Sequence, residues 1–355
     1  MFAALTPIAL VGRYPELLGG AGSLDRYTLP AMMGVSLFAV GAVYALVRSS
    51  LRVWVLAVLV GLSIATQISN ANVYREDWKV QRDLWWQLSW RAPELEPGAV
   101  LVVHDPGPSG PPADYQIWGA ANLYYYPAIT EPVLWGLPLI ERTGQTIRAA
   151  QTRDKVIRKV TFKADTNMSL VLTVPSDSSC LHVLDGDRLE LPLDANSLLR
   201  SVAQFSHVSQ IRADASSVAP PVDVFGKEPA RGWCYYFEKA DLARQVEDWP
   251  RIAQLGNETL RLGLRPTDVT EYLPFVEGYA NAGQFNEAKQ WVGLAIQGLP
   301  RTQAYDEAKA NAVGLPILRQ GLCGLVDRLG RLKSQDPARL SFIAEVGAQV
   351  TCSSR

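Results

Sequence analysis

The sequence predicts a membrane-anchored α+β protein, in which transmembrane helices precede a small α/β segment, an antiparallel β unit and a helical region. Three observations predict this class. Two long uncharged runs stand near the N-terminus, apolar residues alternate with period two after residue 155, and helical periodicity fills the last third of the chain. The 355 residues have a formal net charge of −1, so no basic field indicates a nucleic-acid partner.

Two uncharged runs predict transmembrane helices over residues 28–48 and 52–70. The run "YTLPAMMGVSLFAVGAVYALV" ends before Arg48, and "VWVLAVLVGLSIATQISNANVY" begins after Arg52. A bilayer core about 30 Å thick requires roughly 20 apolar residues in a helix. The alternative, a buried hairpin of a soluble protein, would normally carry a polar face. We therefore expect the lipid bilayer as a partner.

The charged link "RSSLR" between these runs predicts the orientation. Arg48 and Arg52 favour the cytoplasmic side, so everything after about residue 70 would be extracytoplasmic. Basic residues that flank the runs on the outer side weaken this bias: Arg13, Arg26, Arg75, Lys79 and Arg82. The apolar residues 1–12 make a poor signal peptide and are expected to be a partial membrane helix. The transmembrane region then covers residues 1–72, in the C-terminal part of a longer polytopic protein.

A tryptophan-rich stretch predicts an amphipathic interfacial helix over residues 73–92. At 100° per residue, one face of this helix is aromatic and the opposite face is charged. Tryptophan and tyrosine favour the headgroup level of a bilayer, so four aromatics are expected at the membrane interface: Tyr74, Trp78, Trp85 and Trp86. Trp86 and Trp90 lie off the apolar stripe, which indicates burial of the far end on more than one side. This helix could instead dock the soluble domain on the membrane, and a sugar-binding platform is a further alternative.

A small α/β segment is predicted over residues 97–150. "AVLVVHD" is typical of a buried strand, a Pro/Gly-rich loop follows, and residues 115–126 favour a helix. His104 and Asp105 end the strand, where α/β folds often place their sites. A hydrogen-bonded turn is the alternative for this pair. The chain has no G-x-S-x-G, H-E-x-x-H, P-loop or G-x-G-x-x-G motif, so no catalytic residue is predicted.

An antiparallel β unit is predicted over residues 155–215. "KVIRKVTFKAD", "MSLVLTVP", "CLHVLDG" and "RLELP" alternate between turn residues, and "SHVSQIRAD" is a further candidate strand. Asp185 and Asp187 in "LDGD" indicate a hairpin turn, since a calcium loop would need more ligands. Residues 216–232 are expected to be a linker. The sequence predicts no cofactor and no metal site.

The helical region, residues 233–352, contains two predicted helix pairs. The second pair has spacings that resemble a tetratricopeptide repeat (TPR), carried by Tyr272, Tyr279, Gly283, Phe285, Ala288, Ala295 and Pro300. The first pair matches it about 36 residues upstream, but Glu247 replaces the glycine of the turn. Because a free solenoid needs at least three repeats, we expect the array to pack on the β unit. Repeat grooves also bind peptides, so a protein or peptide partner stays open.

The four cysteines allow two disulfides if the domain is extracytoplasmic. The candidate pairs are Cys180 with Cys234 and Cys323 with Cys352. None of them forms a C-x-x-C pair, and the histidines at 182 and 207 do not complete a metal-binding spacing. Four buried free thiols are the alternative.

The order "SLDRYTLPAMMG", two membrane helices and "YREDWKVQRDLWWQLSWRAPELEPG" resembles the C-terminal part of bacterial membrane proteins of the glycosyltransferase 39-like, GT-C type. The resemblance covers mainly residues 1–130 and implies a lipid-linked sugar donor. That family's catalytic acid lies in an early outer loop, and no position here matches it. Two functions are therefore expected. One is a structural or partner-binding extracytoplasmic domain. The other is the C-terminal portion of such a glycosyltransferase, whose catalytic part is absent from this chain.

Overall fold

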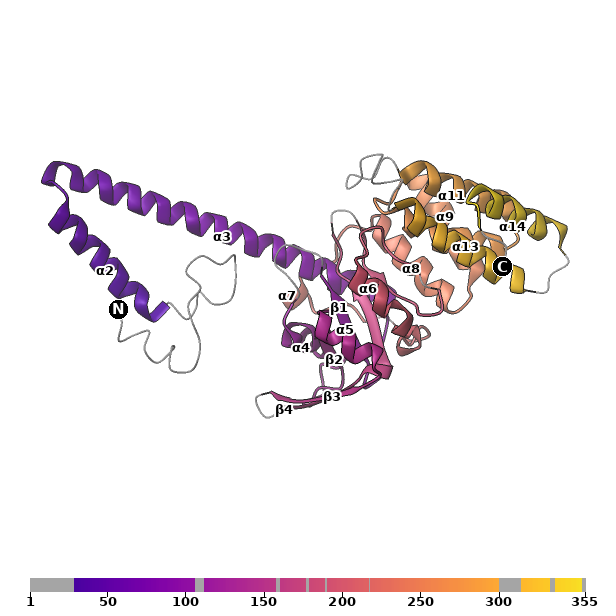
Figure 1. The fold of residues 1–355 in the computed structure, drawn as a ribbon, viewed down its shortest axis with the longest axis horizontal. Helices are drawn as coiled ribbons and strands as arrows, with labels where there is room; N and C mark the ends of the chain where they lie inside the picture. The colour runs from indigo at the N-terminus through magenta and orange to yellow at the C-terminus, as the bar shows by residue number, and fades with distance from the viewer. Residues whose placement is uncertain are drawn as a thin grey trace. The chain divides into compact units, whose positions relative to one another are not determined.

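The chain divides into two compact units, Met1–Lys79 and Val80–Arg355. The computed structural model describes residues 29–105, 112–157, 160–176, 179–188, 190–216, 218–299, 314–332 and 336–352. Figure 1 shows the elements in chain order, from indigo at the N-terminus to yellow at the C-terminus. The partial membrane helix expected over residues 1–12 lies outside the described residues.

The first unit contains α2 (Leu29–Leu46) and the beginning of α3 (Ser49–Arg91). Among the described residues, α3 is the one helix that is long and apolar enough to cross a membrane, and α2 is a shorter apolar helix. Large apolar side chains are exposed along α3, such as Trp54 at 71% and Leu62 at 61%. The Thr66 hydroxyl donates to the Leu62 carbonyl at 2.9 Å, so this hydroxyl is satisfied within the helix. The structure thus contains one candidate membrane helix.

The helix predicted over residues 73–92 is present as the end of α3, which continues without a break to Arg91. Trp85 and Trp86 were expected at the membrane interface, but they are only 3% and 4% exposed in the core of the second unit. The Trp86 Nε1 donates to the Phe225 carbonyl at 3.2 Å. An apolar stripe looks the same in the sequence whether lipid or protein covers it. The burial expected for Trp86 and Trp90 is confirmed, and the interfacial position of the exposed Tyr74 and Trp78 stays a prediction.

The second unit is built around a mixed four-stranded sheet. Its order is β2 (Trp135–Pro138), β1 (Val100–His104), β5 (Ser169–Thr173) and β6 (His182–Val183). β1 is parallel to β2 and β5, whereas β6 is antiparallel to β5. Antiparallel pairing within residues 155–215 is confirmed for β5 with β6, but the predicted separate β unit is wrong, because β5 also pairs in parallel with β1 of the α/β segment. Alternation of apolar residues reveals a strand but carries no information about its partner or direction.

Helices cover both faces of this sheet. On one face, alternate β1 residues such as Leu101 pack against the end of α3, α4 (Asp114–Tyr125) and α7 (Val222–Phe225). A Cβ at Gly136 of β2 would lie 2.5 Å from the Ile117 side chain, so α4 lies directly on this strand. On the other face, Val100 and Val102 belong to the larger core, which includes α5 (Glu141–Arg148), α6 (Ser197–Val202) and the helical region. The expected linker over residues 216–232 thus contains a short helix, α7, whose Phe225 is buried in this core.

A two-stranded hairpin forms a sheet of its own beside the four-stranded sheet. β3 (Thr152–Ile157) and β4 (Val160–Asp165) pair with each other and form a two-stranded sheet. They are followed by the 3-10 helix η2 (Thr166–Met168), and two more such turns are η3 (Ala203–Phe205) and η4 (Val208–Gln210). The candidate strand "SHVSQIRAD" is wrong, because it forms η4 and a single bridge from Ile211 to Leu95. The described residues of "RLELP" form no strand.

The helical region consists of helices that pack in consecutive pairs. These are α8 (Trp233–Gln245) with α9 (Trp249–Leu262), α10 (Leu273–Asn281) with α11 (Phe285–Gly298), and α13 (Leu315–Arg331) with α14 (Pro337–Gln349). A short turn, η5 (Val269–Tyr272), precedes α10. Five of the residues selected for TPR-like packing are buried, namely Tyr272, Tyr279, Phe285, Ala288 and Ala295. Gly283 lies at the turn with φ +75°, and Pro300 is outside the described residues.

Candidate functional site

His104 ends β1 at the carboxyl edge of the parallel strands, where it is 4% exposed. The register places it beside Thr173, and Thr173 beside His182, in a polar row across three strands. The Asn196 Nδ2 donates to the His104 Nε2 at 2.9 Å, and burial lowers the pKa of His104. A neutral, hydrogen-bonded histidine fits this geometry. The structure therefore favours the hydrogen-bonded alternative over a catalytic pair of His104 and Asp105.

Asp185 and Asp187 form a turn directly after β6. The Asp187 backbone N–H donates to the Asp185 side chain at 3.0 Å, and the Arg188 backbone N–H donates to the Asp185 carbonyl at 3.1 Å. Arg188 also pairs with the Asp185 carboxylate at 2.5 Å. A turn is present here, but it is not the expected hairpin turn, because the described residues that follow it form no strand. The Asp185 carboxylate is directed at an arginine of the same segment.

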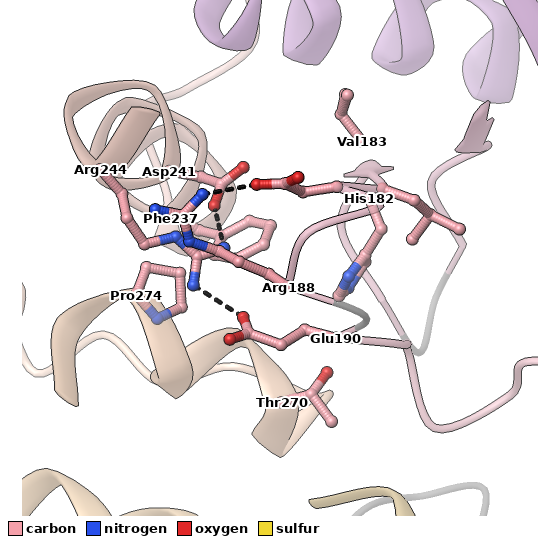
Figure 2. A pocket seen from close by; sticks show the side chains of 11 residues that line it. His182, Val183, Arg188, Glu190, Phe237, Asp241, Arg244, Thr270 and Pro274 are labelled. Carbon is pink, nitrogen blue, oxygen red and sulfur yellow. Dashed lines mark hydrogen bonds and ion pairs between the residues drawn. The ribbon is translucent and has the colours of Figure 1, made fainter. Parts of the chain in front are cut away.

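This turn begins a segment that lies against the first helices of all three helix pairs. Eight charged side chains meet there, and we call them the charged joint: Arg91, Asp185, Arg188, Glu190, Asp241, Arg244, Glu277 and Arg328. They come from α3, the segment after β6, α8, α10 and α13. Figure 2 shows Arg188 and Glu190 facing Asp241 and Arg244. Four of the eight groups are cationic and four are anionic, so the joint is balanced in charge.

Glu190 is the group that joins the segment to two different helices. Its Oε2 accepts from the Arg244 Nη1 of α8 at 2.7 Å, and its Oε1 accepts from the Arg328 Nη2 of α13 at 2.8 Å. Glu277 of α10 accepts from the same Arg328 at 3.0 Å and lies 3.6 Å from the Arg188 Nε. Asp241 accepts from Arg91 at 2.6 Å, which ties α3 to α8. One chain segment is thus held by all three helix pairs.

The charged joint favours the ionised forms of Asp241 and Glu277. Burial would raise the pKa of Asp241, but Arg244 and Arg91 together hold this pKa well below its ordinary value. Burial likewise opposes ionisation of Glu277, and Arg244, Arg328 and Arg188 lower its pKa. Buried ion pairs persist only where such geometry compensates for lost hydration. The network therefore favours a fixed arrangement of sheet and helices.

The cavity beside the joint is too small for an organic ligand. Its volume is about 30 Å³, and its lining includes His182, Phe237, Arg244 and Pro274 (Figure 2). Ligand pockets usually measure about 300–1,000 Å³, whereas this space holds about one water. A wider surface groove of about 870 Å³ lies along α13 and α14 beside Cys323 and Cys352.

Both candidate disulfides are present. Cys180 pairs with Cys234 and Cys323 with Cys352, with Cα–Cα distances of 5.4 Å and 5.6 Å that lie within the usual limit of about 7 Å. All four cysteines of the chain are therefore paired. The first disulfide links the segment before β6 to α8, and the second links α13 to the end of α14.

A buried glutamate contacts both sides of the first disulfide. Glu271 of η5 is 0% exposed and accepts from the Cys180 backbone N–H at 2.7 Å and from the Trp233 Nε1 at 2.6 Å. Its Oε1 lies 3.5 Å from the His182 Nε2. Burial lowers the pKa of His182, but the Glu271 contact and the nearby Asp268 raise it above its ordinary value overall. Sheet, disulfide and helices are thereby connected through one carboxylate.

Sequence reasoning missed the charged joint and Glu271. One signal was present, because Glu277 is the single charge within the apolar helix "LPFVEGYAN", where an unpaired carboxylate would be costly. The partners of Glu277 come from distant segments, so their identity required the fold. Among the described residues, no group of three or more His, Cys, Asp or Glu side chains could hold a metal ion. Comparison of the chain with protein-family models, with curated proteins and with solved structures finds no match.

Proposed function

We propose that this chain is the membrane-anchored part of a protein whose larger unit, Val80–Arg355, is an extracytoplasmic domain with helical repeats. Its role is structural or partner-binding. The observation that carries this proposal is the pairing of all four cysteines in two disulfides. Disulfides persist in oxidising compartments such as the bacterial periplasm or the cell surface, and are rare in the cytosol.

Membrane anchoring by α3 supports the same proposal. This helix has the length and the apolar composition of a membrane span. The basic residues Arg48 and Arg52 flank its beginning, which favours a cytoplasmic location for the link between α2 and α3. A second span by α2, in the opposite direction, would be consistent with this orientation.

The charged joint favours a structural role for one face of the helical region. In repeat proteins, the stacked helices form extended surfaces that bind partners. Here Arg188 and Glu190 already contact α8, α10 and α13, through Arg244, Glu277 and Arg328. A partner would need another face, or would have to displace this segment. The resemblance to GT-C glycosyltransferases and to a lipid-linked sugar donor stays a prediction, because no described contact bears on it.

The proposal is tested by the accessibility of two added cysteines in intact cells. Since the native cysteines are all paired, an added cysteine is the only free thiol. Ser216→Cys places it on the exposed surface of the larger unit, and Ser50→Cys places it at the beginning of α3. We expect a membrane-impermeant maleimide to label the first variant in intact cells and the second only after lysis.

The two variants control for each other, because both positions are exposed and should react fully in lysed cells. Labelling of Ser50→Cys but not of Ser216→Cys in intact cells would place the larger unit in the cytoplasm. The proposal would then be wrong.

A further inference from the structure

The two cysteines of the Cys180–Cys234 disulfide differ in their surroundings. Cys180 is 2% exposed and belongs to the larger core, whereas Cys234 is half-buried and is the second residue of α8. The positive end of a helix dipole stabilises a thiolate in the first turn. Cys234 is therefore the sulfur that a small thiol can reach, and Cys180 is the enclosed partner, as thiol–disulfide exchange requires.

Glu271 contacts the enclosed sulfur. Its Oε2 lies 3.3 Å from the Cys180 Sγ, and the Trp233 Nε1 and the Cys180 backbone N–H hold the carboxylate in place at 2.6 Å and 2.7 Å. A sulfur within a disulfide has no proton to donate, so this contact becomes a hydrogen bond only when Cys180 is a thiol. A disulfide that served only as a cross-link would gain nothing from this acceptor. The geometry therefore fits the opened state as well as the closed one.

His182 lies on the other side of the same carboxylate. Its Nε2 is 3.5 Å from the Glu271 Oε1 and has no hydrogen-bond partner among the described residues. Burial lowers the pKa of His182, but the contact with Glu271 and the charge of Asp268 raise it overall. The imidazole and the carboxylate can therefore hold one proton between them, next to Cys180.

We propose that Cys180, Cys234 and Glu271 form a thiol–disulfide exchange site for low-molecular-weight thiols and their disulfides. In the opening direction, a thiolate RS⁻ attacks the Cys234 Sγ and the bond to the Cys180 Sγ breaks. The Cys180 sulfur leaves with the electron pair and takes the proton held by Glu271 and His182, so the products are Cys234–S–S–R and the Cys180 thiol. In the closing direction, Glu271 takes this proton as the Cys180 sulfur attacks Cys234 and releases RS⁻.

This site goes beyond the structural role proposed above. All of its contacts lie within the larger unit, so it does not depend on the orientation of the chain in a membrane. A failure of the exchange proposal therefore leaves the topology proposal untouched, and the reverse also holds.

The experiment treats the purified full chain in detergent micelles with reduced glutathione at fixed pH. Acid quenching, alkylation and peptide mapping by mass spectrometry then follow the early products. We expect glutathione on Cys234 and a free thiol at Cys180. Glu271→Gln should slow this opening by about tenfold or more, because it removes the positioned proton donor.

Two controls separate proton transfer from a loosened fold. The Cys323–Cys352 disulfide of the same molecules lies in the groove along α13 and α14 and should open at the same rate in every variant. Glu238→Gln changes another buried glutamate, which is 1% exposed on α8, and should leave the opening of Cys180–Cys234 unchanged.

His182→Gln tests the supply of the proton. His182 is near Glu271, Asp268 and Asp194, and it faces the charged joint across the cavity of about 30 Å³. Burial raises the pKa of Asp268 to about 6, so Asp268 titrates below the raised pKa of His182. The rate constant per glutathione thiolate should fall as the pH rises through the pKa of His182, and His182→Gln should lose this dependence. A purely structural histidine would leave the pH profile unchanged.

Opening of Glu271→Gln at the native rate would overturn the proposal, and so would glutathione on Cys180 in place of Cys234. Equal slowing in Glu238→Gln would also overturn it, because the effect would then come from the fold. If Glu271→Gln does not fold, the position of glutathione in the native chain and the pH profile of His182→Gln decide the question.

Discussion

Glu247 and Gly283 occupy equivalent turns of successive helix pairs, 36 residues apart, and both have a left-handed backbone with φ of 57° and 75°. The hydrogen bonds around them also correspond. The Asp248 N–H donates to the Ala243 carbonyl at 2.9 Å, and the Gln284 N–H donates to the Tyr279 carbonyl at 2.9 Å. The repeat seen in the sequence therefore extends to the geometry of the turns, although one turn lacks the glycine.

Glu247→Gly should stabilise the domain by about 1 kcal/mol, because a left-handed backbone is strained for a residue with a Cβ and free for glycine. The converse change, Gly283→Ala, should destabilise it by about the same amount. The measurement is the free energy of unfolding in denaturant. Gln320→Gly, at an exposed position inside α13, is the control and should cost about 0.5–1 kcal/mol. Equal losses for Glu247→Gly and Gln320→Gly would contradict the strain at Glu247.

Arg244→Met should destabilise the domain by about 3–5 kcal/mol, because it leaves the carboxylates of Glu190, Asp241 and Glu277 buried without this partner. Arg212→Met is the matched control at an exposed ion pair with Glu94. It should change stability by less than about 1 kcal/mol. Chemical unfolding of both variants decides the question, and similar losses would show that the charged joint does not lock the sheet to the helices.

Stability should decrease between mildly acidic and alkaline pH. The pKa of His182 in the folded state is raised above 6.5. Its contribution to the free energy of unfolding is therefore complete below pH 6.5 and is lost as the pH rises through the folded-state pKa. Burial raises the pKa of Asp268 from 3.8 to about 6, so its contribution is also lost with rising pH, through about pH 6. His182→Gln should flatten the profile of unfolding free energy against pH. An unchanged profile in this variant would exclude His182 as its source.

Asp241 and Glu277 act in the opposite direction at low pH. Their folded pKa values are lowered, so their contributions are present above the unfolded pKa values and are lost as the pH falls through the folded ones. Burial also lowers the pKa of His104, so this residue removes stability as the pH falls below 6.5. Maximum stability is therefore expected near pH 6.5, before the contribution of His182 is lost at higher pH. If the free energy of unfolding were largest above pH 8, the assignment of these pH effects to Asp241, Glu277 and His182 would be wrong.

Removing either disulfide should destabilise the domain by about 3–4 kcal/mol, from the loop entropy of sequence separations of 54 and 29 residues. The double variants are Cys180→Ser with Cys234→Ser, and Cys323→Ser with Cys352→Ser. The first pair should have the larger effect, because its loop is longer and it links the sheet segment to α8. A loss below about 1 kcal/mol for the first pair would show that the remaining contacts already fix this connection.

Local patterns predicted the helix pairs and the strands β1, β5 and β6, but not β2. Tyr272 and Tyr279 recur at helical spacing on one face, and period-two alternation revealed β5, because these signals depend on neighbouring residues. The parallel pairing of β5 with β1 depends on residues nearly 70 positions apart, and alternation does not encode it. Trp85 was misassigned to the membrane surface because its partner Phe225 follows 140 residues later, in a segment that reads as a linker.

The candidate site was even less predictable, for the same physical reason. Glu190, Arg244, Glu277 and Arg328 lie on four separate segments, and each resembles an ordinary surface charge until the fold brings them together. The disulfide pairs, by contrast, could be predicted from the sequence, because four cysteines allow only three pairings and the proposed orientation permits oxidation.

The central claim is that the larger unit works in an oxidising compartment, and the thiol state of the native chain in intact cells tests it most directly. Cells are quenched with acid, and the chain is reacted with a polyethylene-glycol maleimide before and after reduction under denaturing conditions. We predict no mass increase before reduction and four additions after it, from the two disulfides. Four additions without reduction would mean that the cysteines are free thiols in the cell, and would contradict the extracytoplasmic assignment.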